Sequence, residues 1–233
     1  MTPVPLAVVT GSRKGIGRHL ARHLVAQGYR VVGCSREPAD WTLEGYEHCV
    51  ADVTEEAQVV ALFADVRRRY GAPKVLVNNA GVAAMNHALL TPGATVERIL
   101  RVNVLGTVLV SRECAKLMMQ ERFGRIVNFS TVAVPIGLEG EAAYAASKSA
   151  VEAFTRVLAR ELGPMGITVN AIGPAPTDTD LTRGVPAEKI AGLVERLSIK
   201  RPGTFEDIAN VLDFLIRPES SAVTGQTIYL GGP

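Results

Sequence analysis

The chain has 233 residues, of which 47% are apolar, and a formal net charge of +2. This length and composition suit one α/β domain with a large buried core. The charges are scattered and the chain shows neither a membrane-spanning apolar stretch nor a signal segment, so composition argues against nucleic-acid and membrane partners.

The first predicted element is a strand over Leu6 to Thr10, because its apolar, β-branched residues have the length of a strand buried on both faces. A glycine-rich turn follows, and a helical pattern then runs to near Gly28. Glycines let the main chain approach a pyrophosphate, and the N–H groups at a helix start favour negative charge. This pattern predicts a dinucleotide-phosphate site at Gly11, Arg13, Lys14, Gly15, Ile16 and Gly17, with a purely structural turn as the alternative.

A second strand is predicted over Arg30 to Cys34, followed by Ser35 and Arg36. In a dinucleotide fold this strand end faces the adenosine ribose, where an acidic residue would bind a free 2′-hydroxyl. A hydroxyl and a guanidinium stand here instead, and Arg13 and Lys14 can approach from the glycine loop. This cluster of cations favours a 2′-phosphate, and hence NADP(H) over NAD(H); a solvated Arg36 is the alternative.

The connection from Glu37 to Glu47 is predicted to hold no full helix, and a third strand is predicted over His48 to Ala51. Asp52 and Val53 follow at its carboxyl end. The carboxylate of Asp52 could accept a hydrogen bond from the adenine amino group, or Asp52 or Thr54 could be the N-cap of the helix predicted over Glu55 to Tyr70.

Lys74 to Val77 forms the fourth predicted strand, and Asn78 begins the run N-N-A-G that closes it. The two amides indicate side chains that tie adjacent strand ends together. The glycine indicates a backbone pressed against a ligand, so the cofactor is expected to contact Asn79, Ala80 and Gly81.

One long helix is predicted over Thr95 to Gln120, and its middle, Val102 to Val110, is apolar almost all round. A helix without a polar face must be covered on both sides, which predicts a subunit interface. Asn103 lies in this apolar stretch and needs hydrogen-bond partners there.

The fifth predicted strand, Gly124 to Phe129, delivers the hydroxyls of Ser130 and Thr131 to its carboxyl end, where open α/β sheets bind ligands. The helix that begins near Glu141 then carries Tyr144 and, four residues later, Lys148. That spacing puts both side chains on one helix face.

The remaining elements continue the alternation of strands and helices. They are a strand at Ile167 to Ile172, a proline-rich loop at Gly173 to Thr179, a less patterned segment at Asp180 to Lys200 with a helix at Ala187 to Leu197, a helix at Phe205 to Ile216 and a strand at Gln226 to Leu230. The whole chain, 1–233, is therefore predicted to form one doubly wound, Rossmann-type domain: a mostly parallel, seven-stranded sheet with helices on both faces.

Three motifs together resemble the compact, single-domain branch of the short-chain dehydrogenase/reductase family. They are T-G-x-x-x-G-I-G at Thr10 to Gly17, N-N-A-G at Asn78 to Gly81 and Y-x-x-x-K at Tyr144 to Lys148. The phrases Asn170-Ala171-Ile172 and Thr224-Gly225-Gln226 are similar to those of the family's 3-oxoacyl-[acyl-carrier-protein] reductases.

The resemblance implies a catalytic set. Hydride delivery to a carbonyl builds negative charge on oxygen, which calls for a proton donor and a hydrogen-bond donor. Tyr144 matches the acid, and Lys148, which in the family also holds the nicotinamide ribose, is expected to lower the pKa of the phenol from about 10. In relatives a serine at the position of Thr131 donates a hydrogen bond to the substrate carbonyl, so Thr131 is expected to take this role, with Ser130 as the fallback. Adjacent strand residues point to opposite faces, so the two hydroxyls cannot both serve without a bend.

The resemblance implies further contacts as well. Asn103 matches the asparagine that positions a water molecule for proton relay, although a structural amide is the alternative reading. Pro174, Thr177 and Thr179 match the region that contacts the nicotinamide amide and the phosphates. His87 either lines the pocket or lies in a loop. No metal site is expected, since Cys34, Cys49 and Cys114 lack metal-ligand spacing and are predicted to be reduced thiols of a cytoplasmic protein.

The predicted activity is NADP(H)-dependent reduction of a small-molecule or carrier-bound carbonyl to a secondary alcohol, or the reverse. The alternative is a sensor that binds NADP(H) without turnover, supported only by threonine at position 131. Two other classes of enzyme fit the sequence less well. A nucleotide-sugar epimerase would need a larger C-terminal substrate domain, and a methyltransferase would be expected to have an acidic residue where Ser35 and Arg36 stand. A homo-oligomer, tetramer or dimer, is expected through helices at about 95–120 and 142–162. The segment at about 180–200 is expected to cover the substrate, with its cations facing either an acidic carrier or solvent; they are Arg183, Lys189, Arg196 and Lys200.

Overall fold

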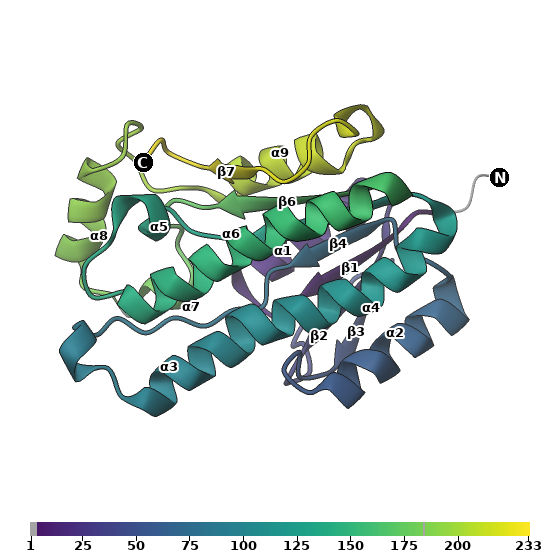
Figure 1. Cartoon of the computed structure of the whole chain (residues 1–233), viewed down its shortest axis with the longest axis horizontal. Helices are drawn as coiled ribbons and strands as arrows, with labels where there is room; N and C mark the ends of the chain where they lie inside the picture. The colour runs from purple at the N-terminus through teal and green to yellow at the C-terminus, as the bar shows by residue number, and fades with distance from the viewer. Residues whose placement is uncertain (1–3, 184) are drawn as a thin grey trace.

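The computed structural model describes residues 4–183 and 185–233 (Figure 1). Seven strands form one sheet in the order β3-β2-β1-β4-β5-β6-β7, and neighbouring strands pair in parallel throughout. The strands are β1 (Leu6–Thr10), β2 (Arg30–Ser35), β3 (Tyr46–Val50), β4 (Val75–Asn78), β5 (Gly124–Phe129), β6 (Ile167–Gly173) and β7 (Thr227–Tyr229). The predicted doubly wound, seven-stranded sheet is confirmed.

Helices cover both faces of this sheet. The helices are α1 (Gly15–Ala26), α2 (Glu56–Tyr70), α3 (Gly93–Leu100), α4 (Gly106–Glu121), α5 (Ala133–Ile136), α6 (Ala142–Leu162), α7 (Asp180–Arg183), α8 (Ala187–Glu195) and α9 (Phe205–Ile216), with short turns η1 (Ala88–Leu90), η2 (Arg101–Leu105), η3 (Gly163–Met165) and η4 (Pro218–Ser220). Helices α2, α4 and α6 lie on the near face in Figure 1, and α1 and α9 lie behind it.

The core is divided into two clusters by the sheet. Successive residues of β1 point to opposite faces, so Leu6 and Val8 pack with α2, α4 and α6, whereas Ala7 and Val9 pack with α1 and α9. This double burial explains why β1 reads as a continuous apolar run. None of the helices within the described residues is long and apolar enough to cross a bilayer.

Several predicted boundaries are wrong by one or two residues, and two of these differences have a visible cause or consequence. The third strand covers Tyr46–Val50 rather than His48 to Ala51, because Tyr46 pairs in register with Val31 and stacks on Trp41 with ring centroids 4.1 Å apart. The helix α8 ends at Glu195, short of Leu197, and a short helix, α7, precedes it. The connection between β2 and β3 contains no helix, as predicted.

The predicted long helix is interrupted by a π-helical turn, η2, between α3 and α4. Asn103 lies within this turn, and its carbonyl accepts a hydrogen bond from Thr107 Oγ1 at 2.7 Å. Such wider turns inside α-helices frequently mark functional sites. Here the turn lies beside the carboxyl ends of the strands, where Asn103 is fully buried.

Side-chain amides tie the strand ends together, as the sequence predicted. Asn79 Nδ2 donates to the carbonyls of Thr10 at 3.0 Å and Gly11 at 3.2 Å, which joins β4 to β1. Asn78 Nδ2 donates to Asn128 Oδ1 at 2.9 Å, which joins β4 to β5. The sheet order reverses direction at β1 and β4, and ligands of doubly wound sheets bind at this switch point.

Candidate active site

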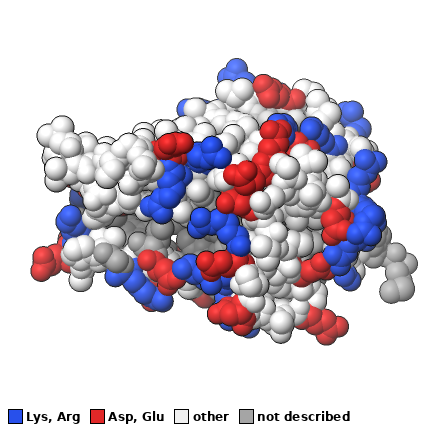
Figure 2. Space-filling model, turned by 90° about the horizontal axis from the view of Figure 1, so that it is seen from below, with Lys and Arg blue, Asp and Glu red and all other residues white. Residues whose placement is uncertain are grey.

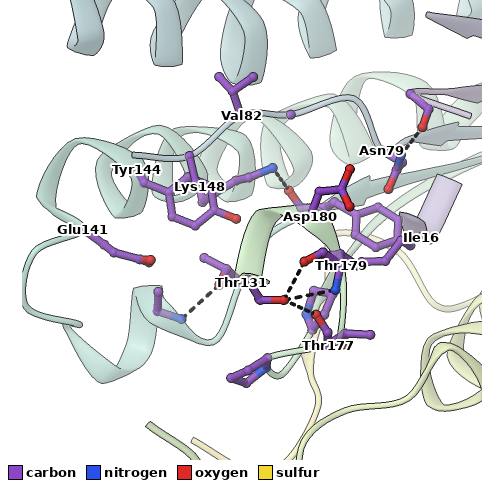
Figure 3. Close-up of a pocket in the computed structure, with 18 of the residues that line it drawn as sticks. Ile16, Asn79, Val82, Thr131, Glu141, Tyr144, Lys148, Thr177, Thr179 and Asp180 are labelled. Carbon is purple, nitrogen blue, oxygen red and sulfur yellow. Dashed lines mark hydrogen bonds between the residues drawn. The ribbon is translucent and has the colours of Figure 1, made fainter. Parts of the chain in front are cut away.

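A cavity of about 900 Å³ opens along the carboxyl ends of the strands (Figure 3). It extends from Arg36 and Asp52 at one end, past the turn at Gly11, to Tyr144 and Lys148 at the other. Of the predicted site residues, the cavity is lined by Gly11, Arg13, Lys14, Ile16, Ser35, Arg36, Asp52, Val53, Asn79, Ala80, Gly81, Ser130, Thr131, Tyr144, Lys148, Pro174, Thr177 and Thr179. Gly15, Gly17 and Asn103 do not line the cavity themselves but lie next to residues that do, namely Thr179, Gly11 and Val82.

The glycine turn is built for a close approach of backbone to backbone. Gly11 and Gly15 have φ values of 67° and 57°, in the left-handed region that favours glycine. A Cβ on Gly17 would collide with the carbonyl oxygen of Gly11, so no larger residue fits there. The helix α1 begins at this point with no side-chain cap bond and no acidic residue in its first turn. Its N-terminus therefore fits an anionic group such as a cofactor phosphate.

Three cationic side chains lie at the end of the cavity where adenosine is predicted to bind, and two of them form ion pairs. Arg13 pairs with Glu37 at 2.9 Å, and Lys14 pairs with Asp180 at 2.5 Å, so Lys14 is drawn towards α7. Arg36 is exposed and lines the cavity. Asp52 Oδ1 accepts from both the backbone nitrogen and the hydroxyl of Thr54 at 2.9 Å, so one of its oxygens is engaged locally.

A chain of polar side chains beneath this end was not anticipated from the sequence. Ser12 Oγ lies 2.8 Å from Tyr46 Oη, which lies 2.6 Å from His48 Nδ1. His48 Nε2 in turn lies 2.9 Å from Ser35 Oγ, which donates to the carbonyl of Glu37 at 2.7 Å. Tyr46 and His48 are two residues apart in β3 and therefore point to the same face of the sheet. Because the strand is predicted to begin only at His48, this alternation did not indicate that Tyr46 belongs to the polar chain.

Tyr144 and Lys148 come together at the other end of the cavity, as their spacing predicted. Both are buried, and Lys148 Nζ lies 5.9 Å from the centre of the Tyr144 ring. Lys148 Nζ donates to the carbonyl of Phe129 at 2.8 Å. This bond fixes the face of α6 against the end of β5.

The expected lowering of the Tyr144 pKa by Lys148 is wrong for this structure. Burial raises the pKa of the Tyr144 phenol, the carboxylate of Glu141 raises it further, and the nearby Thr131 hydroxyl opposes these effects. Burial also lowers the pKa of Lys148 to about 8. Both shifts have the same cause, because a low-dielectric site disfavours the charged form of each group.

Ser130 and Thr131 point in different directions, as adjacent residues at a strand end should. Ser130 Oγ is buried and donates to Glu152, which also accepts from Tyr229 Oη at 2.6 Å. The Thr131 hydroxyl faces Tyr144 and accepts from the backbone nitrogen of Ala133 at 3.2 Å. The hydroxyl beside the phenol is therefore that of Thr131.

The side chain of Asn103 is engaged with the loop that follows β4. Its Oδ1 accepts from the backbone nitrogen of Val82 at 2.8 Å, and its Nδ2 donates to Val82 O and Ser147 Oγ, each at 2.9 Å. These bonds hold the loop against α6. The side chain thus has a structural task, and both readings of Asn103 remain predictions.

The segment over the cavity carries four cations that the sequence analysis singled out, and the structure places two of them in ion pairs and two in the cavity wall. Arg183 pairs with Asp178 at 2.9 Å, and Lys200 pairs with Glu195 at 2.9 Å, so both are neutralised at the surface. Lys189 and Arg196 line the cavity instead. His87 also lines it while remaining exposed.

Glu141 is a cavity residue that sequence reasoning missed. It directly precedes α6 and lines the same space as Tyr144 and Thr131 (Figure 3). Burial raises the pKa of its carboxyl. Its place three residues before Tyr144, on the same turn, was the available signal.

Comparison with known proteins gives a consistent result. Residues 11–232 match the family model described as enoyl-(acyl carrier protein) reductase. The 3-oxoacyl-[acyl-carrier-protein] reductase of Pseudomonas aeruginosa is 34% identical over 97% of this chain and 96% of its own length, and that of Escherichia coli is 31% identical over the same shares. The structure of Thermoplasma acidophilum aldohexose dehydrogenase has a TM-score of 0.90 at 30% identity, covering 99% of this chain and 94% of its own. A putative gluconate dehydrogenase from Agrobacterium tumefaciens also has a TM-score of 0.90, at 28% identity, covering 99% of this chain and 95% of its own.

The lowered pKa of Lys148 predicts a pH-dependent stability. Between about pH 8 and the ordinary lysine value of 10.5, the unfolded chain binds more protons than the folded one, so the free energy of unfolding rises with pH. Lys148→Met removes this rise: the variant gains most relative to wild type at pH 7, and the gain shrinks towards pH 10.

Urea unfolding at pH 7, 8, 9 and 10 measures the difference between variant and wild type. The same change at the exposed Lys116 serves as the control and should leave the wild-type pH trend in place. A Lys148→Met difference that stays constant across this range would contradict the account of a buried, titrating ammonium.

Proposed function

The chain belongs to the short-chain dehydrogenase/reductase family, and we propose that within it the protein is an NADP(H)-dependent carbonyl reductase. The family makes it an oxidoreductase that uses a nicotinamide cofactor and acts on a carbonyl or the corresponding alcohol. One observation carries the proposal: Tyr144, Thr131 and Lys148 face the same cavity as the glycine turn.

The proposed roles follow from the chemistry of a carbonyl oxygen that gains negative charge. When bound in the cavity, the nicotinamide cofactor supplies or accepts the hydride. Tyr144 donates its phenolic proton to the substrate oxygen, and Thr131 donates a hydrogen bond to the same atom. The ammonium of Lys148, whose Nζ lies 5.9 Å from the centre of the Tyr144 ring, partly offsets the cost that burial imposes on the phenolate left on Tyr144.

The proposed cofactor contacts are distributed along the cavity. The backbone from Gly11 to Gly17 and the N-terminus of α1 receive the pyrophosphate. Asn79, Ala80 and Gly81, together with Pro174, Thr177 and Thr179, contact the nicotinamide half. Arg36 and Arg13 line the cavity at its adenosine end, and these two cations support a preference for NADP(H), whose 2′-phosphate they would bind, over NAD(H). Asp52 and Val53 border the adenine.

We also propose a homo-oligomer, a tetramer or dimer, formed through α3, η2, α4 and α6. Large apolar side chains are exposed along these elements: Leu100 is 41% exposed, Leu105 37%, Met119 40% and Val157 56%. Burying such residues against a second copy removes apolar surface from water. The three free cysteines support a cytoplasmic location. The segment at about 180–200 belongs to the same single domain and covers the substrate.

The substrate is proposed to be a small-molecule or carrier-bound carbonyl compound. The relatives named above act on acyl-carrier-protein substrates and on sugars, and both are carbonyl or alcohol substrates. On the face shown in Figure 2, Lys and Arg side chains intermingle with Asp and Glu, which does not suit a nucleic-acid partner. A cofactor sensor without turnover remains the second candidate, favoured only by threonine at position 131.

Removing the phenolic oxygen tests the function directly. Tyr144→Phe is expected to lower kcat about a thousandfold, because the proton donor is lost, while NADPH still binds. NADPH absorbance with a panel of ketones measures turnover, and NADPH fluorescence measures binding. Wild-type binding without any turnover, or a Tyr144→Phe variant as active as wild type, would favour the sensor.

The two neighbouring hydroxyls make a matched pair of variants. Thr131→Val keeps the side-chain shape and removes the donor, so we expect kcat/KM to fall about a hundredfold with little change in NADPH affinity. Ser130→Ala is expected to retain turnover but to lower the free energy of unfolding, since Glu152 loses a buried donor. The opposite pattern would assign the carbonyl contact to Ser130.

Arg36 is expected to set the cofactor preference. Arg36→Glu should weaken NADPH binding about a hundredfold and leave NADH binding unchanged or stronger, because a carboxylate repels a 2′-phosphate and accepts from a 2′-hydroxyl. Side-by-side titration with both cofactors measures the ratio, and Arg22→Glu on the outer side of α1 is the charge-matched control. Equal wild-type affinity for NADPH and NADH would contradict this reading.

A further inference from the structure

Glu141 stands at the N-cap position of α6 but does not act as a cap. Its side chain makes no hydrogen bond to the first turn of that helix. Glutamate is also not among the residues favoured at this position, where a shorter oxygen-bearing side chain reaches the free N–H groups. The helix therefore does not account for this carboxyl, which lies in the wall of the cavity.

The carboxyl is close to the reacting end of the site. Glu141 lines the same cavity as Tyr144 and precedes it by three residues, about one helical turn, and its carboxylate raises the pKa of the Tyr144 phenol. Figure 3 shows the side chains of Glu141, Tyr144 and Thr131 directed into one space. A substrate whose carbonyl oxygen meets Tyr144 and Thr131 would bring its neighbouring carbon towards Glu141.

Within residues 4–183 and 185–233, no side chain or backbone donor pairs with this carboxyl, and burial alone perturbs its pKa. The other charged groups of the same cavity region have their own partners or lie at its mouth. Lys148 donates to Phe129 O, Arg196 donates to Ile136 O at 2.7 Å, Lys189 lies 3.8 Å from Met85 Sδ, and Glu139 is exposed. A half-buried carboxyl without a donor is costly, and a donor carried by the substrate would offset that cost.

We propose that Glu141 binds a hydroxyl group on the carbon next to the reacting carbonyl. The substrates are then α-hydroxy ketones, or vicinal diols in the oxidative direction. This inference rests on the proposed function, since it describes the substrate of that same site. The hydroxyl donates to a Glu141 oxygen while the carbonyl oxygen accepts from Tyr144 and Thr131.

Two features favour a hydroxyl over other substituents. An ammonium group on the same carbon would lie in one cavity with the ammonium of Lys148, which repels it. A carboxylate would be repelled by Glu141 itself. The rest of this region is walled by apolar side chains, which suit the remaining carbon skeleton; they are Met85, Leu138, Val185, Ile190 and Leu193.

Three ketones of nearly equal shape test the proposal: 2-hydroxyacetophenone, propiophenone and 2-aminoacetophenone. Each places a different group, hydroxyl, methyl or ammonium, on the carbon beside the carbonyl carbon. We expect wild type to prefer the hydroxy ketone over propiophenone by at least tenfold in kcat/KM. Glu141→Leu should reduce that preference at least tenfold, mainly through KM, whereas Glu141→Gln, which still accepts a hydrogen bond, should reduce it less.

Glu139→Gln, at the exposed mouth of the cavity, is the control and should leave the preference as in wild type. A preference unaltered in Glu141→Leu, or an equal loss with all three ketones, would overturn the proposal. A wild-type preference for the amino ketone that Glu141→Leu abolishes would overturn it in favour of an ammonium ligand. NADPH binding without consumption of any ketone would instead contradict the proposed function, which separates the two failures.

Discussion

All seven strands run in the same direction, and this constraint places every proposed functional group. Parallel strands end at one edge of the sheet, so the loops after β1, β2, β4, β5 and β6 open on the same side. The amides of Asn78 and Asn79 hold these ends at fixed separations, since each donates across to a neighbouring strand. The bond from Lys148 to Phe129 O then fixes α6 against the same edge.

Burial gives the catalytic end its chemical character. It raises the pKa of Tyr144 and lowers that of Lys148 to about 8, so the charged form of each group is less stable in the folded chain than in water. The phenol of Tyr144 therefore stays protonated, which is the form that can donate a proton to a carbonyl oxygen. The carboxyl of Glu141 adds to the effect on Tyr144, and a substrate hydroxyl that donated to it would weaken that addition.

The doubly wound parallel sheet, most helix positions and the shared helix face of Tyr144 and Lys148 could be predicted from the sequence, because periodicity and motif spacing are local signals. Thr131 was indicated by the family resemblance. Interactions across the chain could not. Lys14 is drawn to Asp180, which lies 166 residues away, and Ser35 belongs to a polar chain through His48 and Tyr46. The direction of the Tyr144 pKa shift also depended on burial and on Glu141, which helix spacing to Lys148 does not reveal.

A crystal structure with NADP⁺ bound tests the central claim most directly. The account predicts the pyrophosphate against the N-terminus of α1, the 2′-phosphate beside Arg36, and the nicotinamide ring beside Tyr144 and Thr131 with Lys148 at its ribose. A cofactor whose nicotinamide ring lay outside this cavity, or away from Tyr144 and Lys148, would contradict the account.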